Sequence, residues 1–184
     1  MYTLIIQGIC LLLWLFFMVI WYRSDPAGEV RRRGALAVPV PLLIAAVFVV
    51  AFIFPFGWAF FPLALAGLVI FLAGFLCALW SKATLGDCWS PGNEIRVMHE
   101  VVREVPYSLV RHPVYVSLVV MLLGTCLIFG SLTMLAATAV CAAILSFMAY
   151  MEERLLMEEL GQGYLDYQEG VPFIVPRISN MWRD

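Results

Sequence analysis

The distribution of charged residues constrains the fold of this chain more than any other feature of its sequence. All 11 Lys and Arg and all 13 Asp and Glu lie in three blocks, residues 23–33, 82–111 and 152–184. Residues 34–81 and 113–151 carry no charge. The chain is 64% hydrophobic, whereas a soluble domain is about half apolar. Because a chain of 184 residues has too little interior to bury such long apolar runs, we expect them to face lipid.

The first apolar stretch, residues 2–22, is about one bilayer long at ~1.5 Å per residue. A cleaved signal peptide is the alternative, but the stretch is too long for a signal core and no Ala-x-Ala pattern follows it. Residues 34–81 are too long for one helix, and Pro55-Phe56-Gly57 predicts a break between helices near 36–54 and 58–81.

The second charge-free span, residues 113–151, predicts a helical hairpin. Gly130-Ser131 is the expected turn, and the two arms of about 17 and 20 residues are just long enough to cross or nearly cross a bilayer. Lys and Arg gather in loops that stay in the cytoplasm, so Arg23 and residues 31–33 place the first loop there. With the predicted helices, every other Lys and Arg then lies on the same, cytoplasmic side of the membrane.

These features predict an all-α integral membrane protein with about five transmembrane helices and an outside amino terminus. Helices 1–3 occupy residues 1–82. The remaining part, residues 83–184, contains a cytoplasmic loop, the helix 4–5 hairpin and a cytoplasmic tail. Within the loop, residues 94–102 alternate polar and apolar side chains, which predicts a short strand at the interface. His99 in this stretch is either a solvated loop histidine or part of a site.

The segment 105–115, Val-Pro-Tyr-Ser-Leu-Val-Arg-His-Pro-Val-Tyr, concentrates polar side chains where the fourth helix enters the membrane. Pro113 suits the first turn of a helix, since its missing N–H costs nothing there. Arg111 and His112 then lie beside free N–H groups at the positive end of the helix dipole, where a carboxylate binds well. In a purely structural alternative, Arg111 reaches lipid phosphates and both tyrosines of the segment are interface anchors.

The carboxyl-terminal part adds acidic and aromatic residues. Glu152 and Glu153 follow the fifth apolar segment, and acidic residues at the end of a helix oppose its dipole. Either the helix continues into the cytoplasm, or these carboxylates bind a cationic group such as an ammonium. Tyr164 and Tyr167 share a helical face, and prolines make residues 171–176 an extended cover segment. The five cysteines include no Cys-x-x-Cys pair, which argues against a zinc or redox site.

Together these motifs resemble the isoprenylcysteine carboxyl methyltransferase family and the wider set of small integral-membrane methyltransferases, including phospholipid methyltransferases. The resemblance covers residues 85–176, about half of the chain. It rests on motifs that occur in the order His99-Glu100-Val101-Val102, Pro106-Tyr107, Arg111-His112-Pro113-Val114-Tyr115, Glu152-Glu153, Gly161, Tyr164, Tyr167 and the cover segment.

The resemblance implies a methyltransferase that uses S-adenosylmethionine in a pocket at the cytoplasmic face, formed by the helix 4–5 hairpin, loop and tail. The implied cofactor-binding residues are His99, Val102, Tyr107, His112, Pro113, Tyr115 and Glu152. Glu152 would take the methionine ammonium, and Arg111 and Glu153 are the implied catalytic residues. The implied acceptor is a lipophilic carboxylate, thiol or amine among membrane lipids or prenylated molecules. No metal and no nucleic acid is expected.

The sequence also departs from that pattern. Val105 stands where the family usually has Gly, and residues 147–150 lack the Arg with which eukaryotic members hold a substrate carboxylate. A prenylcysteine carboxylate is therefore one option among several. Two other functions stay open: an NADPH-dependent sterol-type membrane reductase, and a non-catalytic membrane subunit or transporter on the same scaffold. Transporters normally carry ionisable groups at mid-membrane, and the two charge-free spans carry none.

Overall fold

A computed structural model describes residues 2–22, 30–33, 40–54, 60–89, 94–96 and 101–175 of the chain. Several features predicted from the sequence lie outside these residues: the Pro55-Phe56-Gly57 break, His99, and the first residues of the helices predicted at 36–54 and 58–81.

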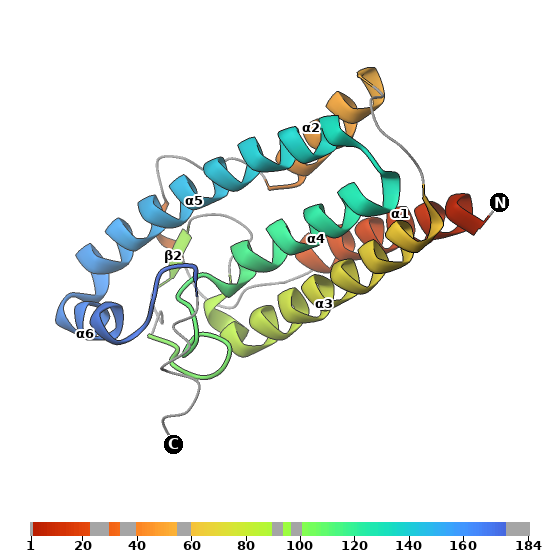
Figure 1. The fold of residues 1–184 in the computed structure, drawn as a ribbon. Coiled ribbons are helices and arrows are strands. Elements are labelled where there is room, and N and C mark those ends of the chain that lie inside the picture. The colour runs from red at the N-terminus through yellow and green to blue at the C-terminus, as the bar shows by residue number, and fades with distance from the viewer. Residues whose placement is uncertain are drawn as a thin grey trace.

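The described elements form a bundle of helices (Figure 1). In chain order they are α1 (Tyr2–Tyr22), β1 (Val30–Arg33), α2 (Val40–Ile53), α3 (Phe61–Leu85), the 3₁₀ turn η1 (Gly86–Cys88), β2 (Glu94–Arg96), α4 (Pro113–Phe129), α5 (Leu132–Leu160) and α6 (Gln162–Gly170). The amino terminus and the α4–α5 turn lie at one end, whereas β2 and α6 lie at the other (Figure 1).

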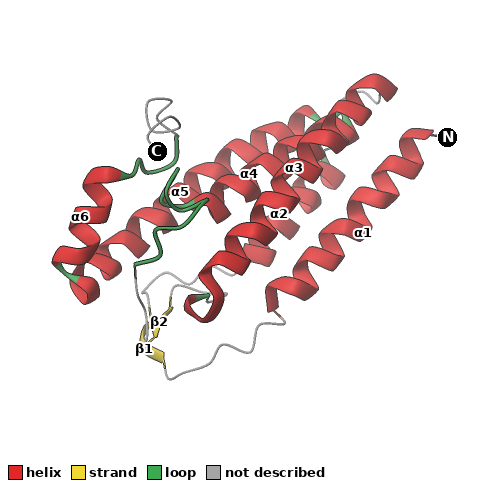
Figure 2. Ribbon diagram, turned by 90° about the horizontal axis from the view of Figure 1, so that it is seen from below, coloured by secondary structure: helices red, strands yellow, loops and turns green. Residues whose placement is uncertain are grey.

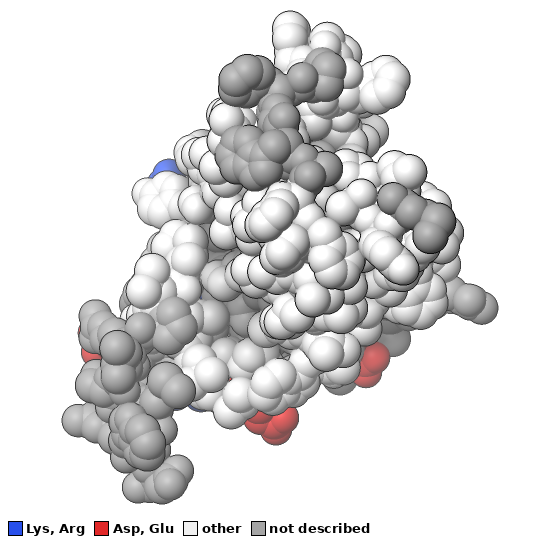
Figure 3. All heavy atoms as spheres, turned by 45° about the vertical axis from the view of Figure 1, so that its right-hand side comes forward, with Lys and Arg blue, Asp and Glu red and all other residues white. Residues whose placement is uncertain are grey.

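The bundle has the composition and dimensions of a membrane protein. Helices α1, α3 and α5 are long and apolar enough to cross a bilayer, and α2 and α4 are shorter apolar helices. Side chains other than Lys, Arg, Asp and Glu cover nearly all of the described surface in Figure 3, and the acidic atoms lie near its edge. The predicted all-helical membrane fold is confirmed, with α1 at the predicted bounds and α2–α5 in the predicted order.

The predicted end of the third helix was wrong by four residues. Helix α3 runs on past Ser81 to Leu85, and Gly86, with a backbone φ of 50°, ends it. Lys82 therefore lies inside the helix. Its ammonium donates a hydrogen bond to the Ile20 carbonyl oxygen and lies 5.2 Å from the centre of the Trp89 ring. A long lysine side chain can carry its charge to the end of a bundle, so one lysine did not end this helix.

Close packing against α3 fixes the position of α4. The two helices share the most extensive contact in the bundle, and glycines allow their backbones to approach. A Cβ atom added at Gly67 would lie 2.6 Å from the Gly124 carbonyl oxygen, and one added at Gly124 would lie 2.6 Å from the Phe71 nitrogen. Small residues at helix contacts are typical of membrane bundles, where van der Waals packing drives association.

The α4–α5 hairpin turns where the sequence predicts. Gly130 has φ 59° in the left-handed region, and the Ser131 side chain accepts a hydrogen bond of 3.1 Å from the Met134 N–H as the cap of α5. Helix α5 then continues to Leu160, so Glu152 and Glu153 lie within it and not at its end. Gly161, with φ 57°, ends α5, and the chain turns into α6.

A two-stranded antiparallel ribbon is added to the helices (Figure 2). The predicted strand is confirmed for Glu94–Arg96 but does not include Val101 and Val102, and its partner, Val30–Arg33, was not predicted. The Val-Arg-Arg-Arg sequence of β1 shows no apolar alternation, so the pairing has no local signal in the sequence.

Candidate functional site

The loop from residue 101 to α4 turns tightly and brings Tyr107 into the interior. The Val105–Pro106 peptide bond is cis, the Tyr107 N–H donates to the Glu104 carbonyl at 2.7 Å, and the Leu109 N–H donates to the Pro106 carbonyl at 3.1 Å. As a result Tyr107 is only 7% exposed. The Val105 position therefore lies in a compact turn.

The Arg-His-Pro motif forms the start of α4, as predicted. Pro113 is the first residue of the helix, and His112 is its N-cap residue, with no side chain capping the free N–H groups. The His112 ring instead faces α5, where its Nε2 lies 3.0 Å from Glu153 Oε1. The first turn of α4 thus keeps its N–H groups near a buried acid–imidazole contact.

Glu153 is the centre of a buried polar cluster. The residue is 4% exposed, and its carboxylate accepts a hydrogen bond of 2.8 Å from Gln168 Nε2 on Oε2. Its other oxygen, Oε1, contacts His112 and also lies 3.2 Å from Arg111 Nη1. The Arg111 contact is at ion-pair distance but lacks hydrogen-bond geometry, and Arg111 Nε and Nη1 have no hydrogen-bond partner within the described residues. A buried carboxylate needs such partners, since desolvation of an unpaired charge is costly.

Glu152 is the more open of the two acids. It is half-buried, and its Oε2 accepts a hydrogen bond of 2.8 Å from the Tyr115 hydroxyl. Its second oxygen makes no hydrogen bond to the part of the chain that the structure describes. The carboxylate therefore has one oxygen oriented by α4 and the other available to a ligand.

A buried hydroxyl group completes the site. The Tyr107 hydroxyl has no hydrogen-bond partner among the described residues. Burial, and then the negative charge of nearby Glu152, raise the pKa of Tyr107 above its ordinary value. The hydroxyl consequently stays protonated at physiological pH and is a free donor.

Helix α6 and the segment after it cover this cluster. Tyr164 and Tyr167 are both buried on one face of α6, as predicted, and the Tyr167 hydroxyl donates to the Tyr107 carbonyl oxygen at 2.6 Å. The Arg111 N–H donates to the Pro172 carbonyl oxygen at 3.0 Å. The Phe173 ring lies 5.1 Å from the His112 ring and 5.5 Å from the Arg111 guanidinium carbon. Pro172 and Phe173 thus lie over the cluster as predicted, but the chain bends at Val171 and again at residues 173–175, so the predicted extended conformation was wrong.

The structure brings together seven of the nine residues that the sequence singled out, namely Tyr107, Arg111, His112, Pro113, Tyr115, Glu152 and Glu153. Val102 is half-buried next to Val101, which packs against the Leu156–Tyr164–Tyr167 cluster. His99 lies outside the described residues. The sequence did not predict Gln168, although its spacing of four from Tyr164 places it on the buried side of α6.

The fold and the site define an integral-membrane helical protein with a buried polar centre at one end of its bundle. The sequence model of the phospholipid methyltransferase family matches residues 63–163. This match covers more than half of the chain and includes every residue of the buried centre except those of α6 after 163. The chain therefore belongs to the phospholipid methyltransferase family.

A solved structure supports the same grouping. The eukaryotic intramembrane Ras methyltransferase, an isoprenylcysteine carboxyl methyltransferase, resembles this chain with a TM-score of 0.57 and 26% sequence identity. The similarity covers 76% of this chain and 51% of that one, so the chain spans about half the length of the protein it matches. No curated protein sequence matches the chain.

Proposed function

We propose that this protein transfers a methyl group from S-adenosylmethionine to a lipophilic acceptor at the cytoplasmic face of the membrane. The observation that carries the proposal is the pair of adjacent acids on α5: Glu153 contacts several protein groups, whereas one oxygen of Glu152 has no hydrogen bond to the described residues. Membership of a methyltransferase family gives this arrangement its chemical context.

The charges at the site fit the polar groups of S-adenosylmethionine. Its methionine part carries an ammonium and a carboxylate. The free oxygen of Glu152 suits the ammonium, and the uncapped N–H groups at the start of α4 suit the carboxylate. Within the described residues, the Tyr107 hydroxyl and Arg111 Nε and Nη1 are buried polar groups without hydrogen-bond partners, and such groups can mark a binding site. His112 and Pro113 would form the wall between these groups.

When bound, the cofactor supplies an electrophilic methyl group and a neutral leaving group. The contribution of the chain is alignment of the reacting atoms, which is worth up to ~7–11 kcal/mol. Glu153 holds His112, Arg111 and Gln168 in one arrangement, so its predicted catalytic role is best expressed as positioning. Arg111 Nε and Nη1 have no hydrogen-bond partner among the described residues, and the guanidinium lies beside the Phe173 ring, so Arg111 is the candidate to contact the reacting molecules directly. Pro172 and Phe173 of the cover segment lie over this centre, where they would help to exclude water.

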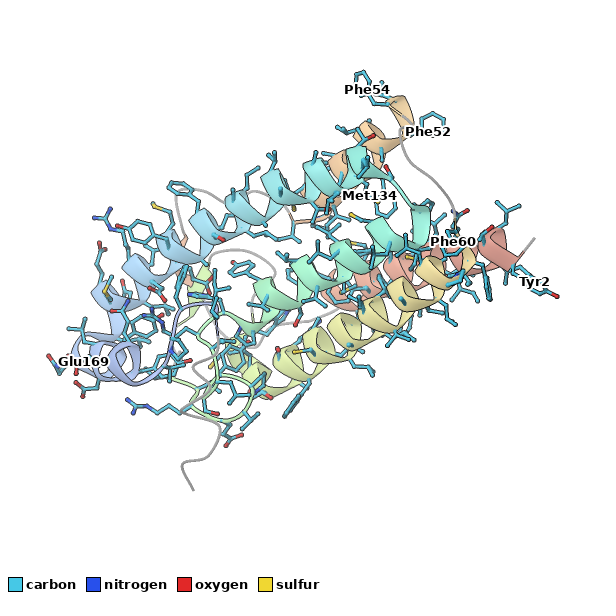
Figure 4. The ribbon with its side chains drawn as sticks, viewed as in Figure 1. Tyr2, Phe52, Phe54, Phe60, Met134 and Glu169 are labelled. Carbon is cyan, nitrogen blue, oxygen red and sulfur yellow. The ribbon has the colours of Figure 1, made fainter. Side chains whose placement is uncertain are left out.

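The distribution of charge supports a cytoplasmic site. The basic residues of the described chain lie in β1, β2, the last turns of α3, the loop before α4 and the far part of α5. These elements lie toward the α6 end of the bundle (Figure 1), and positive residues favour the cytoplasmic side. At the opposite end Figure 4 shows Tyr2 and Phe60, far from Glu169 on α6. We accordingly propose that residues 83–184 form the catalytic core and residues 1–82 the membrane support.

The apolar surface near the site suits an acceptor that arrives from the membrane. Phe147 and Tyr150 on α5, in the turn before Glu152, are 50% and 51% exposed, and neither they nor buried Met148 carry a positive charge that could form an ion pair with a carboxylate. A long apolar chain would therefore bind beside α5, and the reacting group would be an amine, thiol or carboxylate at its end. An amine must lose a proton before it attacks.

Ligand binding by the purified protein in detergent tests this proposal. S-adenosylhomocysteine should raise the melting temperature and bind in calorimetry, whereas NADPH should do neither. Membranes that contain the protein should transfer tritiated methyl from S-adenosylmethionine to extractable lipid, and release of labelled methanol by base would identify a carboxyl ester. Stabilisation by NADPH without stabilisation by S-adenosylhomocysteine would replace the proposal with a reductase.

Replacement of Tyr107 by Phe separates ligand binding from stability. Because the hydroxyl has no partner in the described structure, its removal should leave the melting temperature of the free protein unchanged or slightly raised. The same change should weaken S-adenosylhomocysteine binding by about 5- to 10-fold, the value of one hydrogen bond. A large drop in melting temperature with unchanged affinity would show that the hydroxyl serves the fold.

A further inference from the structure

Gln168 contacts the buried centre from outside the motif residues. Its Nε2 donates to Glu153 Oε2 at 2.8 Å, on the opposite oxygen from the one that contacts His112 and Arg111. Among the described residues, Gln168 provides the hydrogen bond from α6 to the Glu153 carboxylate. Gln168 is itself half-buried.

The position of Gln168 is set by the anchoring of α6. This helix has only nine residues, and its place depends on contacts to the loop before α4. Tyr167 donates to the Tyr107 carbonyl oxygen, and the Arg103 guanidinium donates to the Gly163 carbonyl oxygen at 3.1 Å. These bonds hold the next residue, Gln168, against α5.

A carboxylate can rotate about its last side-chain bond. For Glu153, such a rotation would change which oxygen faces His112 and Arg111. Unless Oε2 has its own donor, it becomes an unsatisfied buried acceptor. The carboxylate would then turn to share the donors of Arg111 and His112 between both oxygens. The Gln168 amide removes this freedom, because it satisfies Oε2 and leaves Oε1 facing the two basic side chains.

We propose that Gln168 is a positioning residue, which acts through Glu153 to fix the orientation of His112 and the donors of Arg111 at the cofactor site. The proposal rests on the proposed function for the identity of the ligand. The orientation of His112, however, is a property of the free protein. Helix α6 therefore couples the cytoplasmic tail to the start of α4.

Four variants test this role. Gln168→Leu removes the donor at similar volume, Gln168→Glu replaces it with an acceptor, and Gln168→Lys restores a donor. Gln162→Leu is the matched control, since Gln162 is exposed on the same helix and bonds only to Asp166 within the described residues. The chain has two histidines, so the imidazole resonances of labelled protein are few, and a His99→Asn variant assigns them.

The His112 resonance should move in Gln168→Leu and Gln168→Glu and keep its native position in Gln168→Lys and Gln162→Leu. S-adenosylhomocysteine affinity should fall at least about fivefold in the first two variants and stay within about twofold in the others. A native His112 resonance in Gln168→Leu and Gln168→Glu would overturn the proposal, as would equal loss of affinity in all three Gln168 variants. If the native protein binds no S-adenosylhomocysteine, the proposed function fails, and the His112 resonance still decides the role of Gln168.

Discussion

Glu152→Gln is expected to weaken S-adenosylhomocysteine binding by about 30-fold, or ~2 kcal/mol. The amide has the shape of the carboxylate and can still accept the hydrogen bond from Tyr115. It lacks the negative charge that we propose to face the methionine ammonium, and a partly buried charge pair loses more than a surface pair when one partner is removed. Calorimetry on the detergent-solubilised protein measures the change, and the melting temperature of the free protein should hardly move.

Two variants control this experiment. Glu169→Gln removes the same charge from an exposed position on α6 (Figure 4) and should leave affinity within twofold of native, at about 0.4 kcal/mol or less. Tyr115→Phe should give an intermediate loss, because Glu152 keeps its charge but loses the group that orients it. Native affinity in Glu152→Gln would remove Glu152 from the cofactor site.

The membrane fold was largely readable from the sequence because its physical causes are local. A run of apolar residues that ends before Arg23 predicts α1, and the Gly130-Ser131 pair predicts the α4–α5 turn. The end of α3 was harder to predict from the sequence. A single lysine suggested a boundary, whereas the helix ends only where Gly86 adopts a positive φ.

Strand β1 was not accessible to this reasoning, because its pairing depends on residues about sixty positions later in the chain. The register that pairs Val30 with Arg96 and Arg33 with Glu94 depends on the tertiary structure. In the sequence alone, the basic residues of β1 predict only that their loop is cytoplasmic. Their strand conformation follows from a partner that no local pattern in the loop identifies.

The site was predictable as a set of residues and not as a set of contacts. The sequence shows two adjacent acids, but consecutive helical residues point about 100° apart. Glu152 therefore faces Tyr115 and Glu153 faces His112, across separations of 37 and 41 residues. Which acid is engaged and which has a free oxygen depends on the rotation of α5, and hydropathy does not determine that rotation. The same holds for Gln168, whose role depends on where α6 docks.

Glu153→Ala should destabilise the protein more than any other single change at the site, by about 3–5 kcal/mol. The side chain is 6% exposed and contacts His112, Arg111 and Gln168. Its removal leaves the Arg111 charge buried without its partner, which costs more than the lost pair itself contributed. Arg154→Ala changes the next residue, which is exposed and has no ion pair within the described chain, and should shift the melting temperature little.

A double variant distinguishes loss of charge balance from loss of packing. Glu153→Leu combined with Arg111→Met removes both charges and keeps apolar volume, so it should recover at least about half of the stability lost in Glu153→Leu alone. It should still not bind S-adenosylhomocysteine, because the Arg111 donors and the support of His112 are gone. Thermal unfolding of the native protein, Glu153→Leu, Arg111→Met and the double variant in one detergent gives the coupling energy between the two side chains. If Glu153→Leu unfolds at the native temperature, the buried centre does not stabilise the fold. If the double variant is no more stable than Glu153→Leu, the stability lost in Glu153→Leu comes from packing and not from the unpaired guanidinium.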